Sequence, residues 1–129
     1  MAGTAIDLEH LARYTGGEKG LNGEILQLFD GQITSMVAEL NGLLASQDSK
    51  RWREIAHTIK GAARGVGAFE MGEAAAKAEP VDPADSAEAK AAIQKLEREA
   101  QTVRAFIATY LAAYAVDLVA STIIHHGRP

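Results

Sequence analysis

Apolar residues recur every three or four positions along most of this chain, a spacing that predicts helices rather than strands. No stretch alternates apolar and polar residues for long enough to form a sheet. We expect a short first helix that begins after Asp7 as N-cap and ends at Gly16 and Gly17. A longer second helix follows. The apolar positions expected to face the core from it are Leu21, Ile25, Phe29, Ile33, Met36, Leu40 and Leu43.

Polar and helix-breaking residues separate the next two helices. Asp48 or Ser49 can cap a third helix that continues to about Val66. A fourth helix is expected over residues 69–78, because the Pro-Val-Asp-Pro sequence at 80–83 cannot continue it. The connections between these segments are short, so consecutive helices are expected to pack antiparallel.

The last predicted helix begins with Asp85 and Glu88, which have the spacing of a capping box. The positions expected to face the core from it are Ala89, Ile93, Leu96, Ala100, Val103, Ile107 and Leu111. Together the segments predict an all-α protein, an antiparallel four-helix bundle with a short N-terminal capping helix.

The end of the last helix carries a mostly apolar run over residues 105–124, long enough to span a membrane in principle. We expect no span there, because alanine contributes little to insertion and Asp117 would cost about 2.5–3.5 kcal/mol near the centre. The bundle also needs the first half of the run. We therefore assign residues 1–114 to the domain and residues 115–129 to a C-terminal extension of unknown role. The far end of the apolar run is expected to overhang the core and to pack against either the domain or a second copy.

Composition narrows the class of protein further. A length of 129 residues fits one domain with a single core. The formal net charge of -4 leaves no basic surplus for nucleic acid. The chain has no cysteine and begins with no secretory signal, since Asp7 and Glu9 fall where an apolar run would lie. We expect a cytoplasmic protein that binds neither nucleic acid nor membrane and is a monomer, with weak self-association through the last helix as the alternative.

The third helix separates into two faces when it is wound at about 100° per residue. The residues expected on its buried face are Trp52, Ile55, Ala56, Ile59, Ala62, Ala63 and Val66. The opposite face carries Arg53, Glu54, His57, Lys60, Gly61, Arg64 and Gly65. His57 therefore points into solvent near the middle of the polar face.

Two features of this face favour chemistry at His57. Gly61 and Gly65 follow it at one and two turns, although an exposed glycine costs a helix about 0.5–1 kcal/mol relative to alanine. The missing side chains would let another macromolecule bring its backbone close to the ring. Arg53, Lys60 and Arg64 are the i−4, i+3 and i+7 neighbours of His57. We expect this cationic frame to favour the neutral imidazole and to attract an anion.

A neutral, exposed imidazole in a cationic frame suits phosphoryl transfer. Its free nitrogen can attack phosphorus and form a phosphohistidine. Lys60 is best placed to contact the phosphoryl oxygens, with Arg64 as a second candidate. The sequence offers no carboxylate cluster for Mg²⁺ and no glycine-rich phosphate loop. We therefore expect no autonomous kinase or hydrolase activity and no cofactor of the protein's own.

The sequence around His57 resembles the histidine phosphotransfer (HPt) domains of bacterial phosphorelays. Residues 56–63, Ala-His-Thr-Ile-Lys-Gly-Ala-Ala, followed by Val-Gly-Ala at 66–68, match the family pattern, and weaker similarity covers about residues 6–110. The resemblance implies that His57 is the phosphoacceptor, that Lys60 supports the phosphoryl group and that Gly61 makes room for a receiver domain. Arg64 and Gly65 depart from the pattern, which carries a small and a polar residue there.

The implied partners are receiver domains of response regulators and of a hybrid histidine kinase, which would supply Mg²⁺. Arg53 is either a solvated charge or part of the docking surface, and Leu28 either ordinary rim packing or part of an apolar docking ring. Two other classes remain open. The protein could bind receivers without being phosphorylated. Glu54 and His57 also have the Glu-x-x-His spacing of di-metal bundles, although such ligands must point into the core.

Overall fold

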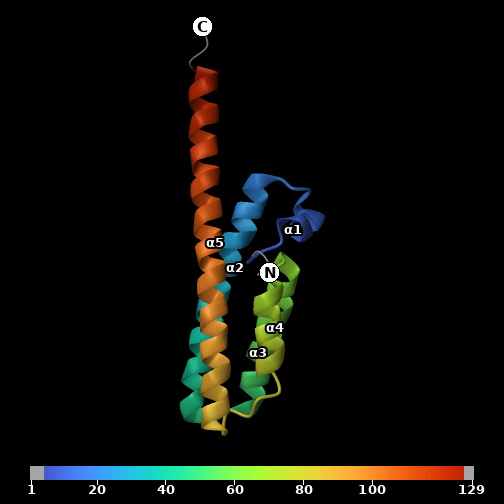
Figure 1. Ribbon diagram of the computed structural model, residues 1–129, viewed down its shortest axis with the longest axis vertical. Helices are drawn as coiled ribbons and strands as arrows, with labels where there is room; N and C mark the ends of the chain where they lie inside the picture. Colours follow the sequence, from blue (N-terminus) through green and yellow to red (C-terminus); the bar gives the residue numbers. More distant parts are fainter. Residues whose placement is uncertain (1–4, 127–129) are drawn as a thin grey trace.

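The computed structural model describes residues 5–126, and their side chains as far as residue 122. Its helices are α1 (Leu8–Thr15), α2 (Lys19–Ser46), α3 (Ser49–Val66), α4 (Phe69–Ala78) and α5 (Ser86–His126). Figure 1 shows α2 beside α5, α3 beside α4, and α1 at one end of the bundle. The predicted all-α fold is confirmed, and the bounds of α3 and α4 agree with those expected from the sequence.

Side-chain caps explain where most of the helices begin. Asp7 and Asp48 accept hydrogen bonds from backbone N–H groups in the first turns of α1 and α3. Asp85 accepts one from the backbone of Glu88 at 3.3 Å, as its capping role predicts. Glu18 caps α2, so this helix starts earlier than its apolar pattern indicated. Gly16 ends α1 in the left-handed conformation, as predicted.

The core lies between the helices and is closed at one end by Trp52. This side chain is completely buried, and its indole Nε1 donates a 2.8 Å hydrogen bond to the backbone carbonyl of Ala78. Burial without this bond would leave the indole N–H unsatisfied, whereas the Ala78 carbonyl also accepts a 3.0 Å hydrogen bond from the backbone N–H of Val81. The bond therefore fixes the C-terminal end of α4 against the first turn of α3.

The start of α2 corrects one part of the predicted core. Leu21 was expected to face inward but is 37% exposed, whereas Leu26 is fully buried. The reason is a polar contact that apolar spacing does not reveal. Asn22 is buried because its Oδ1 accepts a 2.6 Å hydrogen bond from the hydroxyl of Thr15. This bond orients the first turn of α2, and Leu21 consequently lies at the rim.

Helix α5 continues beyond the bundle without a break at residue 114 (Figure 1). Its contacts with Lys19 of α2 lie on both sides of this point. The Tyr110 hydroxyl donates a 2.9 Å hydrogen bond to the carbonyl of Lys19, and Lys19 Nζ lies 3.7 Å from Asp117 Oδ2. By length and composition α5 could cross a membrane, since its most apolar window has a mean hydropathy of 1.5 and only 11% of that window is buried.

Gly67 forms the tight connection between α3 and α4. Its φ of 88° is left-handed, and its carbonyl accepts a 2.9 Å hydrogen bond from the backbone N–H of Asp7. A methyl group on Gly67 would lie 2.6 Å from the Asp7 carbonyl oxygen. Neither the backbone conformation nor the space accepts a side chain here. The chain ahead of α1 is thus held directly on the turn between α3 and α4.

We predict that Gly67→Ala lowers the free energy of unfolding by about 2–4 kcal/mol, because it combines a left-handed alanine with a backbone clash. Thermal and urea unfolding followed by circular dichroism will measure the loss. Gly31→Ala is the matched control, because Gly31 is helical and a methyl group there meets nothing within 4 Å. The control should be unchanged or more stable by up to about 1 kcal/mol. Equal stability of the two variants would contradict this role of Gly67.

Candidate functional site

His57 lies on the solvent-facing side of α3, as its position on the helix predicted. Its side chain is 69% exposed, and the opposite face of α3 packs into the core through Trp52, Ile55 and Ile59. Lys60, one turn later, is partly covered, with 22% of its side chain exposed. The ring is therefore not one of the bundle's packing groups. It is available to a molecule arriving from solvent.

Glu79, which the sequence analysis did not identify, joins the two predicted site residues. Its Oε1 lies 3.1 Å from His57 Nδ1, and its Oε2 accepts a 2.7 Å hydrogen bond from Lys60 Nζ. We call these three side chains the His57–Glu79–Lys60 cluster. Glu79 directly follows Ala78, whose carbonyl is held by Trp52. The buried indole thereby places the carboxylate beside the histidine.

The contact with Glu79 assigns the proton on the imidazole. An ionised carboxylate can only accept hydrogen bonds, so the 3.1 Å contact requires a proton on His57 Nδ1. In the neutral ring Nε2 then carries the free lone pair. The carboxylate thus both holds the ring in one orientation and selects the nitrogen that can act as a nucleophile.

The electrostatics of the site differ from the purely cationic frame that the sequence predicted. The Lys60 ammonium, through its hydrogen bond, holds the pKa of Glu79 below its ordinary value of 4.5, and the bond to His57 acts in the same direction. Partial burial of the carboxyl opposes both effects. Glu79 is therefore ionised at neutral pH, and its charge offsets that of Lys60. The predicted frame of three uncompensated cations is wrong in this respect.

The two arginines of the predicted frame are placed differently from Lys60. Arg64 is exposed, but its side-chain stem lies along α4 at Gly72, where a methyl group would come within 3.0 Å of Arg64 Cγ. Arg53 is exposed, and the described residues offer it no ion pair. The structure thus brings Lys60 into contact with the His57 partner, Glu79, and leaves Arg53 and Arg64 outside that network.

The bare backbone beside His57 is present as predicted. Gly61 and Gly65 are both exposed, and a methyl group on either would meet no atom within 4 Å. Packing inside the domain therefore does not require glycine at these two positions. Their absent side chains leave open space on the same side of α3 as the ring.

Apolar side chains are exposed on the neighbouring helices. Leu28 of α2 is 75% exposed and Tyr14 of α1 is 67% exposed. Beside Gly65 lies a shallow, almost wholly apolar hollow. It is lined by Leu11, Tyr14, Ile25, Gly65 and Val66. The polar face of α3 thus adjoins an apolar surface formed by α1 and α2.

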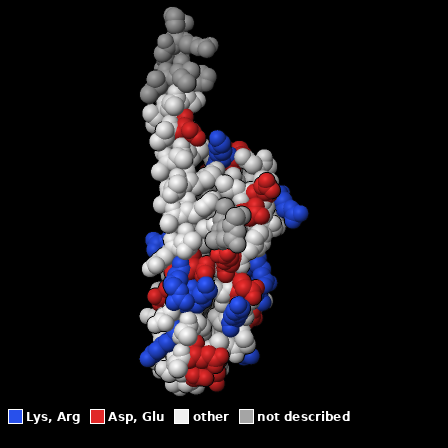
Figure 2. Space-filling model, viewed as in Figure 1, with Lys and Arg blue, Asp and Glu red and all other residues white. Residues whose placement is uncertain are grey.

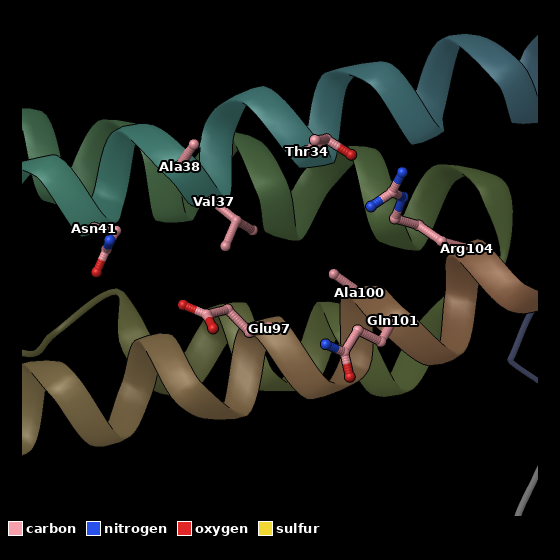
Figure 3. A pocket seen from close by; sticks show the side chains of 8 residues that line it. All are labelled: Thr34, Val37, Ala38, Asn41, Glu97, Ala100, Gln101 and Arg104. Atoms are coloured by element: carbon pink, nitrogen blue, oxygen red, sulfur yellow. The ribbon is translucent and has the colours of Figure 1, made fainter.

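A second concavity, drawn in Figure 3, lies between α2 and α5 and offers no comparable chemistry. Its lining includes two charged side chains, Glu97 and Arg104, and Arg104 is already paired with Asp30 at 2.7 Å. Across the residues that the structure describes, no group of three His, Asp or Glu side chains could hold a metal ion. Glu54, offered above as a metal ligand, lies 3.5 Å from Arg51.

The symmetry of the α3–α4 hairpin about its turn is the sequence signal that could have identified Glu79 as the partner of His57. His57 and Glu79 lie at equal sequence distances on either side of Ala68, and so do Arg64 and Gly72. A tight antiparallel turn brings such positions opposite one another. The predicted fourth helix ends at Ala78, one residue before Glu79, so the pattern of that helix does not include the partner of His57.

Comparison with known proteins identifies the family of this chain. The family model described as the Hpt domain matches residues 24–109. A search of curated proteins and a search of solved structures found no match. The family match covers more than half of the chain, including all of α3 and α4 with the His57–Glu79–Lys60 cluster. This chain therefore belongs to the Hpt domain family, whose members carry phosphoryl groups in two-component signalling.

Proposed function

We propose that His57 is the phosphoacceptor of a phosphorelay and passes a phosphoryl group between the receiver domains of a hybrid histidine kinase and a response regulator. The observation that carries the proposal is the hydrogen bond between Glu79 and His57 Nδ1, which leaves Nε2 as the free nucleophile on an exposed ring. Family membership supports the reaction class, histidine phosphotransfer with receiver domains.

The proposed step is an in-line displacement at phosphorus. The Nε2 lone pair of His57 attacks the phosphorus of a receiver's aspartyl phosphate, and the bond from phosphorus to the aspartate oxygen breaks. The products are a phosphohistidine and a free aspartate carboxylate. The proton stays on Nδ1, and the positive charge that develops on the ring is stabilised by Glu79. Transfer onward to a second receiver is the reverse of this step.

Lys60 is proposed to contact the phosphoryl oxygens. An ammonium group has three donors, of which one is used in the 2.7 Å bond to Glu79 Oε2. The other two can bind the incoming group without releasing Glu79. The receiver domain would supply Mg²⁺. Its positive charge, together with that of Lys60, would neutralise the phosphoryl oxygens. The domain itself thus acts as a carrier and does not turn over ATP.

Docking is proposed to use the surface around the ring. Gly61 and Gly65 would allow the receiver's backbone to approach, while Leu28 and the apolar hollow beside Gly65 would pack against it. Arg53 and Arg64 would face the acidic surroundings of the receiver's aspartate. A relay needs rapid release, so a small and transient interface is expected.

We predict that His57→Gln abolishes phosphorylation by a phosphorylated receiver, because glutamine has no nucleophilic ring nitrogen. Acid-labile radiolabel on the protein, followed after mixing with a labelled receiver, will measure this. His10→Gln is the control, since His10 packs against Tyr14 and Phe69 and should be dispensable. Full labelling of His57→Gln would refute the proposal. A wild type that binds the receiver without acquiring label would favour a non-phosphorylated binding module instead.

We predict that Gly61→Gln slows receiver exchange by roughly tenfold or more, since a side chain there occupies the approach to the ring. Thermal stability should stay unchanged or rise, because a helical glycine is replaced where no atom is crowded. Transfer rates and melting curves are compared with those of Gly31→Gln, an equally open helical glycine on α2. Normal exchange combined with a marked loss of stability would show that Gly61 serves the fold.

We predict that Glu79→Gln slows phosphotransfer by roughly tenfold, because a neutral amide stabilises the charged ring less well. It also removes a pH-dependent contribution to stability. Since the pKa of Glu79 in the folded protein lies below 4.5, its ionised form stabilises the fold above about pH 4.5. That contribution is lost as the pH falls through the lowered pKa.

Urea unfolding of wild type and Glu79→Gln at several pH values tests this second effect. The wild type should be the more stable protein at pH 7, and the difference should shrink at pH 3.5. A difference that is constant from pH 7 to pH 3.5 would show that the carboxylate charge does not link α3 to α4. The Glu97→Gln variant, which alters an exposed carboxylate on α5, provides the control.

A further inference from the structure

In the described residues, the part of α5 that passes the bundle is largely exposed, although Asp117 still lies near Lys19 of α2. Val116, Leu118 and Val119 are 66%, 50% and 59% exposed. A shallow apolar hollow on the same segment is lined by Ala115, Val116, Val119 and Ala120. Figure 2 shows the described portion of this projection as largely free of acidic and basic side chains. Exposed apolar surface of this extent usually marks an interaction site.

A subset of the exposed residues of α5, which includes Val119 but not Val116 or Leu118, has the spacing of a coiled coil. The positions concerned are all exposed and are separated by three, four, three, four and three residues. They are Ala105, Ala108, Ala112, Ala115, Val119 and Thr122, and we call them the α5 seam. A 3-4 repeat places side chains along one line where a second helix can interlock with them. None of the seam residues is buried; Ile107 is the last fully buried residue of α5, and Tyr110 and Leu111 still pack against the core from another side of the helix.

The charges on this segment lie away from the seam. Between residues 105 and 122 the sequence has one charged residue, Asp117, which is about 160° around the helix from Val119 on the 100° winding. Asp117 points back towards Lys19 of its own bundle, at 3.7 Å. The seam is therefore neutral throughout, and a second neutral seam complements it without burying a charge.

These observations fit a second copy of the chain better than a membrane. An interfacial membrane helix normally carries Lys or Arg on its polar face, and residues 105–122 contain neither. A span needs about 20 free residues. In the apolar run at 105–124, Ile107 is buried in the core and the Tyr110 hydroxyl is hydrogen-bonded to Lys19. The first part of this run is therefore not free to enter a membrane. The same patch on two copies can instead pair about a two-fold axis.

We propose that two copies of this protein associate through the α5 seam into a weak dimer. Residues 105–122 form a cylinder about 27 Å long and about 10 Å across, of which the charge-free half offers roughly 400 Å². Two copies would bury roughly 800 Å², less than the about 1,200–2,000 Å² of stable complexes. The dimer should therefore dissociate in the micromolar range or weaker.

The proposed dimer leaves both phosphoacceptor faces open. In the described part of the chain, α3 pairs with α2 and α4 but not with α5, so α3 and α5 lie diagonally across the bundle. The seam and His57 therefore do not compete for one surface. The proposed dimer does not depend on the proposed phosphotransfer, and each can be tested without the other.

Sedimentation equilibrium of the full chain, from a few micromolar to several hundred micromolar, tests the proposal. The weight-average mass of the wild type should rise from 13.7 kDa towards twice that value. Val119→Glu should remain monomeric over the whole range, because association would bury an unpaired charge. Ser121→Glu is the matched control. It adds the same charge at an exposed position about 200° around α5 from Val119, and it should associate like the wild type.

Three results would overturn the proposal: a wild type that stays monomeric at several hundred micromolar, association that survives Val119→Glu, or association lost equally in Ser121→Glu. Circular dichroism should show equal helix content and melting temperature for the two variants at low concentration, since neither position is buried. Co-sedimentation with vesicles of mixed neutral and anionic phospholipid tests whether the α5 seam binds a membrane instead of a second copy. Vesicle binding by a monomeric wild type, lost in Val119→Glu, would assign the seam to a membrane instead.

Discussion

The chemistry of this molecule depends on the close antiparallel packing of α3 against α4. Gly67 makes the turn between them tight, and the Trp52 indole bonds the far end of α4 through the Ala78 carbonyl. With both ends fixed, the two helices cannot slide relative to each other. Glu79 is consequently held 3.1 Å from His57 Nδ1, although it lies outside the last turn of α4. A buried hydrogen bond on the core side thus determines which nitrogen is free on the solvent side.

The arrangement separates the demands of folding from those of function. The buried side of α3 carries the packing, and its exposed side carries an oriented imidazole, a lysine and bare backbone. The helix gives up stability at Gly61 and Gly65, where alanine would be better tolerated. The proposed docking of a receiver domain, whose backbone would approach there, accounts for this loss of stability. In the proposed transfer the paired charges of the cluster have separate roles: Glu79 would stabilise a ring that becomes positive, and Lys60 would bind the phosphoryl oxygens.

Much of the fold could be predicted from the sequence because its signals are local. Caps at Asp7 and Asp48 and the glycine at position 16 fixed helix ends within one or two residues. The exposure of His57 followed from helical winding alone. The burial of Leu26 and the contact between Glu79 and His57 could not be predicted from local signals, since both depend on contacts between helices. The boundary proposed at residue 114 stays a prediction, because α5 runs through it and its later residues still contact α2.

Nitrogen-15 NMR of the His57 imidazole, before and after phosphorylation by a receiver, tests the central claim most directly. The account predicts that at neutral pH the ring carries its proton on Nδ1 and that phosphorus couples to Nε2 after transfer. His10→Gln simplifies the assignment without altering the cluster. A ring protonated on Nε2 and free at Nδ1, or a phosphoryl group attached to Nδ1, would contradict the role assigned to Glu79.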